Sequence, residues 1–189
     1  EFIMFETFNL DSKILSAIEA AGYKTPTPIQ QQAIPLVLEG RDLLGLAQTG
    51  TGKTAAFVLP ILQKLGKGPT NRVRALILAP TRELAEQIHQ TIVTLGKDSR
   101  LRSITIYGGV SKKWQLKELQ RGADIVVACP GRLLDHMHER NINLSQIEML
   151  VIDEADRMCD MGFLPDVKRI LATLPKQKQT LLFSATMPD

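Results

Sequence analysis

The sequence has few of the features that would place it outside ordinary globular proteins. It has two cysteines, Cys129 and Cys159, with no CxxC pair or Cys/His cluster, which excludes a disulfide scaffold and gives no sign of a zinc site. Its 13 glycines and 10 prolines show no period, which excludes collagen-like and low-complexity chains. No apolar run approaches the roughly 18 residues that would span a bilayer, and the N-terminus does not read as a signal peptide. We therefore expect a reduced, cytoplasmic protein with no membrane partner.

Hydrophobic residues make up 44% and charged residues 23% of the 189 residues, which excludes a disordered chain and suits one domain. The net charge is only +3, but it is unevenly distributed. Residues 1–40 and 121–189 are net acidic, whereas residues 41–120 hold thirteen basic and five acidic groups. A basic middle third suits a polyanionic partner, although solvated helix faces would give the same count.

Short apolar runs alternate with helical patterns along the chain. The predicted strands are residues 43–46, 75–79, 103–107, 125–128, 149–152 and 180–183. Apolar residues recur at three- and four-residue steps over residues 54–65 and 82–95, which predicts helices. This alternation predicts an α/β fold: a mostly parallel sheet with helices on both faces, and ligands beyond the carboxyl ends of its strands.

The first 40 residues break this alternation. We expect residues 1–4 to be a cloning remnant ending in the start methionine. Residues 5–40 hold two short helical patterns separated by the rigid, proline-containing residues 25–28. They are predicted to form an N-terminal extension packed on the sheet of a domain spanning residues 41–189.

Residues 47–54 read Ala-Gln-Thr-Gly-Thr-Gly-Lys-Thr between a predicted strand and a predicted helix. This matches the phosphate-loop (P-loop) pattern, except that Ala47 stands at the first glycine. Its glycines let successive backbone N–H groups face an anion, and the helix start adds the positive end of its dipole. The alternative is a Gly/Thr-rich turn with an incidental lysine. The expected nucleotide-binding residues here are Gln48, Thr49, Gly50, Thr51, Gly52, Lys53, which reaches the β- and γ-phosphates, and Thr54, which binds Mg²⁺.

An apolar strand at residues 149–152 runs into the carboxylates of Asp153, Glu154 and Asp156. Mg²⁺ takes oxygen ligands and keeps several waters, so one carboxylate near Thr54 is enough to hold it, and Asp153 fits that role partly through water. Glu154 is then placed to orient or deprotonate an attacking water, which makes it a catalytic candidate with Lys53 and Asp153. The alternative is an acidic loop that caps the next helix.

Residues 153–156 spell D-E-A-D, and together with the P-loop they resemble the DEAD-box family of ATP-dependent RNA helicases. Further segments resemble the family's signatures in the same order. These are Gly22-Tyr23-Lys24-Thr25-Pro26-Thr27-Pro28-Ile29-Gln30, Pro80-Thr81-Arg82-Glu83-Leu84-Ala85, Gly108-Gly109, Pro130-Gly131-Arg132 and Ser184-Ala185-Thr186. One departure is Cys129, which stands where the family normally has threonine and offers a weaker hydrogen-bond partner.

The resemblance implies a RecA-like fold and a role for each segment. Adenine recognition falls to Phe5, Tyr23, Thr25 and Gln30. Sequence-independent RNA-backbone contacts fall to Pro80, Thr81, Arg82, Gly108, Gly109, Pro130, Gly131 and Arg132. Coupling of the nucleotide site to lobe motion falls to Asp156, Ser184, Ala185 and Thr186, with a hydrogen bond expected from Asp156 to Ser184 or Thr186.

The family's enzymes have two similar lobes, and the chain is expected to be the first of them, with ATP, Mg²⁺, RNA and the second lobe as partners. Because the second lobe supplies arginine fingers, we expect this chain to bind nucleotide with little turnover and no unwinding. Two alternatives stay open: a P-loop ATPase that acts on DNA or protein, and an ATP-gated RNA clamp that does not unwind.

Overall fold

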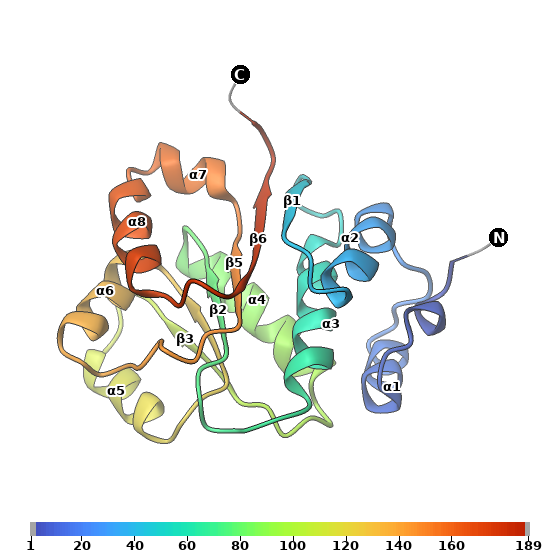
Figure 1. The fold of residues 1–189 in the computed structure, drawn as a ribbon, viewed down its shortest axis with the longest axis horizontal. Helices are drawn as coiled ribbons and strands as arrows, with labels where there is room; N and C mark the ends of the chain where they lie inside the picture. The colour runs from blue at the N-terminus through green and yellow to red at the C-terminus, as the bar shows by residue number, and fades with distance from the viewer. Residues whose placement is uncertain (1–2, 188–189) are drawn as a thin grey trace.

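The predicted strands form one sheet in the computed structural model, which describes residues 3–187 (Figure 1). Residues 1 and 2, part of the expected cloning remnant, lie outside the described residues. Within the described range the strands are β1 (Leu43–Leu46), β2 (Ala75–Leu78), β3 (Ser103–Ile106), β4 (Ile125–Ala128), β5 (Met149–Ile152) and β6 (Gln179–Ser184). Their order is β1-β6-β5-β2-β4-β3, and each neighbouring pair is parallel. The predicted α/β class and parallel sheet are confirmed.

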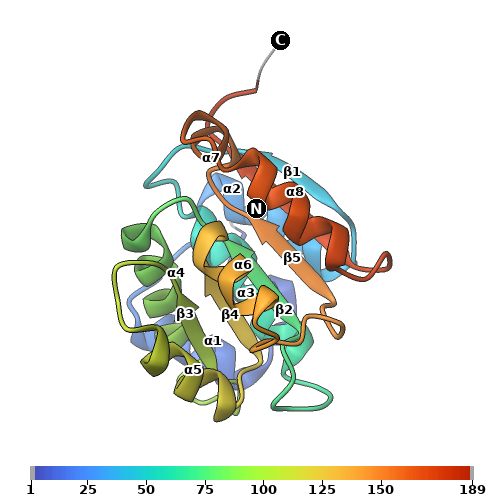
Figure 2. The same cartoon turned by 90° about the vertical axis from the view of Figure 1, so that its left-hand side faces the viewer.

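Helices cover both faces of this sheet. After the 3₁₀ turn η1 (Phe5–Phe8), the helices are α1 (Ser12–Ala20), α2 (Pro28–Leu38), α3 (Lys53–Leu65), α4 (Arg82–Leu95), α5 (Lys112–Gln120), α6 (Pro130–His138), α7 (Ala155–Asp160) and α8 (Leu164–Thr173). Figure 1 shows α1–α4 on one side of the sheet and α5–α8 on the other, and Figure 2 shows α5, α6 and α8 across the face turned to the viewer.

Successive side chains of each strand point to opposite faces of the sheet, so each strand contributes side chains to two apolar cores. In β2, Ala75 and Ile77 join the core beneath α3 and α4, whereas Leu76 and Leu78 join the core beneath α6 and α8. All four side chains are buried, which explains why the central strands read as continuous apolar runs rather than as an alternating pattern.

The N-terminal extension lies on the α3–α4 side. Helix α2 packs on α3 and on β1, while α1 packs on α3 and α4. The side chains of η1 and α1 join the same apolar core as α3, so the extension is part of the fold. The Asp11 side chain accepts a hydrogen bond from the Lys13 backbone N–H and caps α1.

The carboxyl ends of parallel strands meet at one edge of the sheet. In Figure 1 this is the edge toward which β6 points. The loops after the strands and the first turns of the helices that follow therefore gather there, and together they hold every catalytic, phosphate-binding and RNA-binding residue predicted from the sequence. Strand ends differ from prediction by one residue at β2, β3 and β6, within the usual uncertainty of element boundaries.

Candidate functional site

The structure brings together the lysine of the P-loop and the acidic end of β5. Lys53 is the first residue of α3, and its Nζ lies 3.0 Å from Oδ1 of Asp153. The same Nζ lies 3.8 Å from Oε1 of Glu154. Lys53 is 5% exposed and Asp153 is fully buried. Residues one hundred positions apart in sequence thus form one buried, charged cluster, as strands β1 and β5 end at the same edge.

Asp153 keeps one carboxylate oxygen without a partner. Its Oδ1 accepts from Lys53 and from the Glu154 backbone N–H at 2.9 Å. Its Oδ2 is buried and has no hydrogen-bond partner among the described residues. Burial raises the pKa of Asp153, and the nearby Lys53 ammonium opposes that shift. A buried carboxylate oxygen without a partner is costly on its own and suits a cation ligand.

Glu154 sits in a conformation that non-glycine residues seldom adopt. Its φ is 50° and its ψ 51°, in the left-handed region, at the N-terminal cap of α7. This turn directs its side chain back toward Lys53, and its Oε2 also lies 3.3 Å from Nη1 of Arg157. A strained backbone conformation persists only where the surrounding structure holds it in place, and such conformations are often found at functional sites.

The P-loop has the backbone geometry of an anion site. Gly50 and Gly52 have φ of 82° and 83°, and Gly52 caps the N-terminus of α3. The Thr51 hydroxyl donates to the Gln48 carbonyl at 2.7 Å and closes the loop. The Ala47 N–H donates to the Ser184 carbonyl at 3.0 Å and ties the loop start to β6. Thr54 follows Lys53 in the first turn of α3.

Gln30 joins the predicted adenine motif to the P-loop. Its Oε1 accepts from the Thr27 N–H at 2.9 Å, and its Nε2 donates to the Gly52 carbonyl at 3.0 Å. The side chain is 1% exposed. The sequence did not indicate these protein partners. One amide hydrogen and one lone pair remain for a base, and an adenine reaches them only if the covering residues move.

Tyr23 is the exposed aromatic ring of the adenine motif. It is 38% exposed, and its ring centroid lies 6.3 Å from that of Phe5. Phe5 is buried and also packs edge-on against Phe8. Phe5 thus supports Tyr23 from behind rather than facing solvent itself. Thr25 is exposed beside them.

The first RNA segment predicted from the sequence surrounds the N-terminus of α4. The Thr81 hydroxyl accepts from the Leu84 N–H at 3.2 Å and caps this helix, after the buried Pro80. Arg82 is exposed, with its guanidinium 5.1 Å from the centroid of the Tyr107 ring. The Tyr107 hydroxyl in turn donates to Glu86 at 2.6 Å. The helix end and the supported arginine suit an anionic backbone.

The second predicted RNA segment lies in the loop after β3, and the third forms the first turn of α6, which follows β4. Gly108 and Gly109 are exposed, Gly109 has φ 80°, and a Cβ on either would meet no atom within 4 Å. Gly131 follows the buried Pro130, and a Cβ on Gly131 would also meet no atom within 4 Å. Arg132 points inward: its Nη1 donates to the Val110 carbonyl at 3.1 Å and to Oε1 of Gln115 at 3.2 Å.

The hydrogen bond expected from Asp156 is present, and its partner is Thr186. The backbone N–H and the hydroxyl of Thr186 donate to Oδ2 of Asp156 at 3.2 and 3.0 Å. Burial acts to raise the pKa of Asp156, but hydrogen bonds from Thr186, the Arg157 backbone N–H and Ser184 outweigh it, so the pKa is lowered. The Ser184 hydroxyl donates to the Thr186 carbonyl at 2.6 Å, and Ala185 between them is exposed. The segment after β6 is thus tied to the segment after β5.

Cys129, the departure from the family pattern, lies half-buried at the start of α6. Its N–H donates to the Ile106 carbonyl at 2.8 Å, and no side-chain bond caps the helix. Burial, with Glu83 nearby, raises the pKa of its thiol to about 11. The thiol is therefore protonated near neutral pH and acts as a small apolar side chain.

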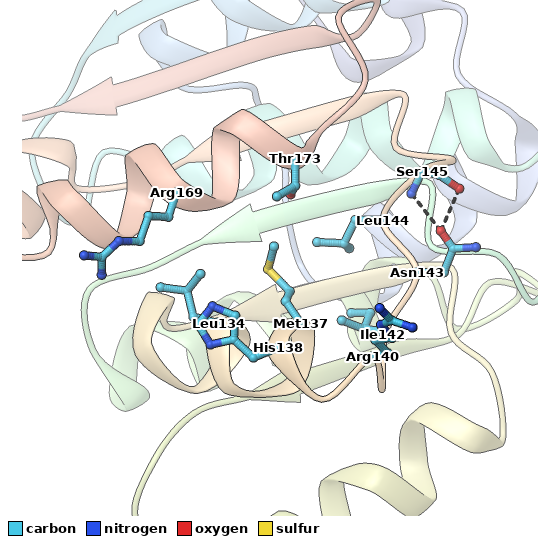
Figure 3. Close-up of a pocket in the computed structure, with 10 residues that line it drawn as sticks. All are labelled: Leu134, Met137, His138, Arg140, Ile142, Asn143, Leu144, Ser145, Arg169 and Thr173. Atoms are coloured by element: carbon cyan, nitrogen blue, oxygen red, sulfur yellow. Dashed lines mark hydrogen bonds between the residues drawn. The ribbon is translucent and has the colours of Figure 1, made fainter.

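Another hollow of the molecule holds none of the predicted site residues. A groove of about 570 Å³ lies between α6 and α8, with Met137 and Leu144 on its apolar floor and Arg140 and Arg169 at its rim (Figure 3). Separately, none of the helices in residues 3–187 has both the length and the apolar character needed to cross a bilayer.

A P-loop before α3, facing acidic residues at the end of a parallel strand, defines a nucleotide-binding domain of the P-loop class. The model of the DEAD/DEAH box helicase family matches residues 27–189, and the chain belongs to this family.

Among curated relatives, the chain is 50% identical over 185 residues to the ATP-dependent RNA helicase CshA of Listeria monocytogenes. It is 47% identical over 186 residues to the DEAD-box ATP-dependent RNA helicase CshA of Bacillus subtilis. These matches cover 98% of the chain but only 35% and 37% of the relatives, so the chain spans about a third of their length.

A solved structure of a DEAD box protein from the hyperthermophile Methanococcus jannaschii superposes with a TM-score of 0.92 at 42% identity. The superposition covers 100% of the present chain and 51% of the Methanococcus jannaschii chain. The predicted RecA-like fold of a first helicase lobe is confirmed.

The sequence did not indicate two supporting contacts: Gln115, which lies behind the second and third predicted RNA segments, and Glu86, which is bonded to the Tyr107 ring that lies beside Arg82. Gln115 is four residues before Leu119 on the buried side of α5, which is the one pattern that could have suggested its burial. Nothing in the sequence pairs Glu86 with Tyr107, because their hydrogen bond joins residues 21 positions apart.

Proposed function

We propose that this chain is the ATP-binding and RNA-binding first lobe of an ATP-dependent RNA helicase. The observation that carries the proposal is the convergence of Lys53, Asp153 and Glu154 at one buried point beside the P-loop. A second RecA-like lobe of the longer protein completes the enzyme, which couples ATP hydrolysis to local unwinding of RNA duplexes. The cytoplasmic location expected from the sequence stays a prediction.

The P-loop and the lysine would hold the phosphates of ATP in this lobe, in the manner of a Walker A motif. The N–H groups around Gly50 and Gly52 offer an anion nest, and the first turn of α3 adds its dipole. In the structure the Lys53 ammonium pairs with Asp153. When ATP binds, this ammonium must also contact the β- and γ-phosphates. Exchanging one anionic partner for another keeps the buried ammonium paired throughout.

Mg²⁺ fits the same site. The donor set is the Thr54 hydroxyl and the unpartnered Oδ2 of Asp153, both oxygens, with water and phosphate oxygens to complete the shell. The ion would neutralise charge that develops on the phosphate oxygens.

Glu154 is the group placed to orient, or take a proton from, the attacking water. Its carboxylate is held between Lys53 and Arg157 at the start of α7. Asp156, two residues further along, is bonded to Thr186, so a shift at the end of β5 passes directly to the segment after β6. We propose that this link carries the state of the nucleotide to the neighbouring lobe.

RNA would lie across the loops after β2, β3 and β4, with its backbone toward the protein. The features offered there are the end of α4, the arginine on Tyr107 and three glycines with open space around them. These groups recognise phosphate and sugar rather than base edges, so binding is independent of sequence.

The adenine motif provides the test of the nucleotide site. We expect calorimetric titration with Mg²⁺ to show tighter binding of ADP than of GDP, and Gln30→Ala to weaken ADP binding by about tenfold, since it removes hydrogen bonds to the P-loop and to the base. Gln32 is an exposed neighbour on α2, and Gln32→Ala is the matched control. It should change neither the affinity for ADP nor the affinity for GDP. Equal binding of both nucleotides, unaffected by Gln30→Ala, would leave a general P-loop domain and refute adenine recognition.

A further inference from the structure

Gln115 is a fully buried polar side chain that touches both loops behind the proposed RNA surface. It lies on α5, is 1% exposed, and has every polar atom bonded to protein. Its Nε2 donates to the Tyr107 carbonyl at 2.7 Å, directly before Gly108. Its Oε1 accepts from Nη1 of Arg132 at 3.2 Å and lies 3.0 Å from Nε2 of His136.

The orientation of this amide is fixed by its partners. A carbonyl only accepts and a guanidinium only donates, so Nε2 faces Tyr107 and Oε1 faces Arg132. His136 must then donate from its Nε2 to Oε1, leaving its Nδ1 to accept from Nδ2 of Asn141 at 3.1 Å.

The protonation state of His136 agrees with that arrangement. Burial lowers its pKa, and the charges of Lys112 and Arg132 act in the same direction, against Glu139 and Asp135. The imidazole is therefore neutral near pH 7, with a single N–H.

The Gly108-Gly109 turn is thereby held on both sides. The Tyr107 carbonyl before it is bound by Gln115, and the Val110 carbonyl after it is bound by Arg132. Arg132 also donates to Oε1 of Gln115, so the two side chains that bind these carbonyls are bonded to each other. Glycines with open space around them have no side-chain packing of their own, so these bonds restrict the turn between the packed side chains of Tyr107 and Val110.

We propose that Gln115 is a positioning residue that holds the loop of residues 107–111 and the first turn of α6, residues 129–132, in the register required for RNA-backbone binding. This inference rests on the proposed RNA function of those two segments. In it, Arg132 acts from behind the loop, and the backbone N–H groups of the loops face the phosphates. Preorganised donors bind more tightly than donors that must first be ordered.

The test compares the Gln115→Met variant with the unchanged chain. Methionine keeps the length of the side chain and removes all three hydrogen bonds. We expect affinity for a fluorescein-labelled ten-nucleotide oligouridylate to fall by about tenfold, with a shallower dependence on salt because fewer phosphates are contacted. Amide hydrogen exchange should speed up at Gly108, Gly109 and Val110, while ADP affinity stays unchanged.

Gln179→Met is the matched control. Gln179 also binds two carbonyls, of Val37 and Arg41, and accepts from Lys64, but at the start of β6, the opposite edge of the sheet. This variant should lose thermal stability while keeping RNA affinity and its salt slope. A loss of RNA affinity equal to that of Gln115→Met would show a general effect of destabilisation and overturn the inference.

Gln115→Glu covers the case in which the methionine variant does not fold. It keeps the acceptor for Arg132 and His136 and puts an oxygen that repels the Tyr107 carbonyl in place of the donor, so the turn is released on one side and RNA affinity should be intermediate. If the unchanged chain binds no oligouridylate, the RNA part of the proposed function fails and this inference with it. If the chain binds RNA and the folded variants bind it equally well, this inference alone fails.

Discussion

Lys53→Met is expected to lower ATP affinity by about 100-fold, because it removes the buried ammonium at the start of α3, beside the P-loop. Asp153 would lose its charge partner in a buried site, so the free energy of unfolding should fall by about 3–5 kcal/mol near neutral pH. Calorimetry with ATP and urea denaturation measure the two effects. Lys64→Met, at the other end of α3, should leave ATP affinity unchanged.

The loss of stability caused by Lys53→Met is expected to depend on pH in one direction. Burial raises the pKa of Asp153 in the folded state, and without Lys53 the shift becomes larger. A carboxyl whose folded pKa lies above its unfolded value stabilises the fold at low pH and loses that contribution as pH rises through the folded pKa. The stability difference between Lys53→Met and the unchanged chain should therefore narrow from pH 8 to pH 5. A constant difference would show that the ion pair does not hold Asp153 in its ionised form.

Gly52→Ala is expected to disrupt the P-loop through two separate effects. Its φ of 83° costs an alanine about 1–2 kcal/mol. The Cβ of the new alanine would also lie 2.6 Å from Nε2 of Gln30 and 2.8 Å from Oγ1 of Thr27. These distances are too short, so the contact between the predicted adenine motif and the P-loop must open. We expect a loss of stability that exceeds the conformational cost by about 1–3 kcal/mol, and nucleotide binding too weak to measure by calorimetry.

Gly50→Ala separates the two effects. Its φ is 82°, nearly the same, but a Cβ there would meet no atom within 4 Å. It should show the conformational cost alone. Equal destabilisation by the two substitutions, in urea denaturation, would mean that the Gln30–Gly52 contact does not restrain the loop.

Much of the fold was predictable because buried parallel strands are short and strongly apolar. The runs at residues 43–46, 125–128 and 149–152 match β1, β4 and β5 at both ends. The strand order was not predictable, because parallel strands of similar composition carry no local signal for their neighbours. It is fixed by which helix packs on which face, a long-range property of the whole domain.

The candidate site was predictable where a motif implies a place at the edge of the sheet. The contact between Lys53 and Asp153 follows from a P-loop after one strand and carboxylates after another. The inward direction of Gln30 and Arg132 was not predictable, because a motif fixes a residue's position but not its hydrogen-bond partners. The left-handed conformation of Glu154 had no signal either, since glycine and, less often, asparagine or aspartate mark that region in a sequence, and glutamate does not.

The central claim is that one edge of this sheet carries a nucleotide site and an RNA site side by side. The most direct measurement is a map of backbone amide chemical shifts in the chain, titrated first with Mg²⁺-ADP and then with a ten-nucleotide oligouridylate. We predict that the nucleotide shifts residues 47–54 and 153–154, and that the RNA shifts residues 81–82, 108–109 and 131–132. RNA-induced shifts confined to the opposite edge, around Lys67 and Arg72, would contradict the claim.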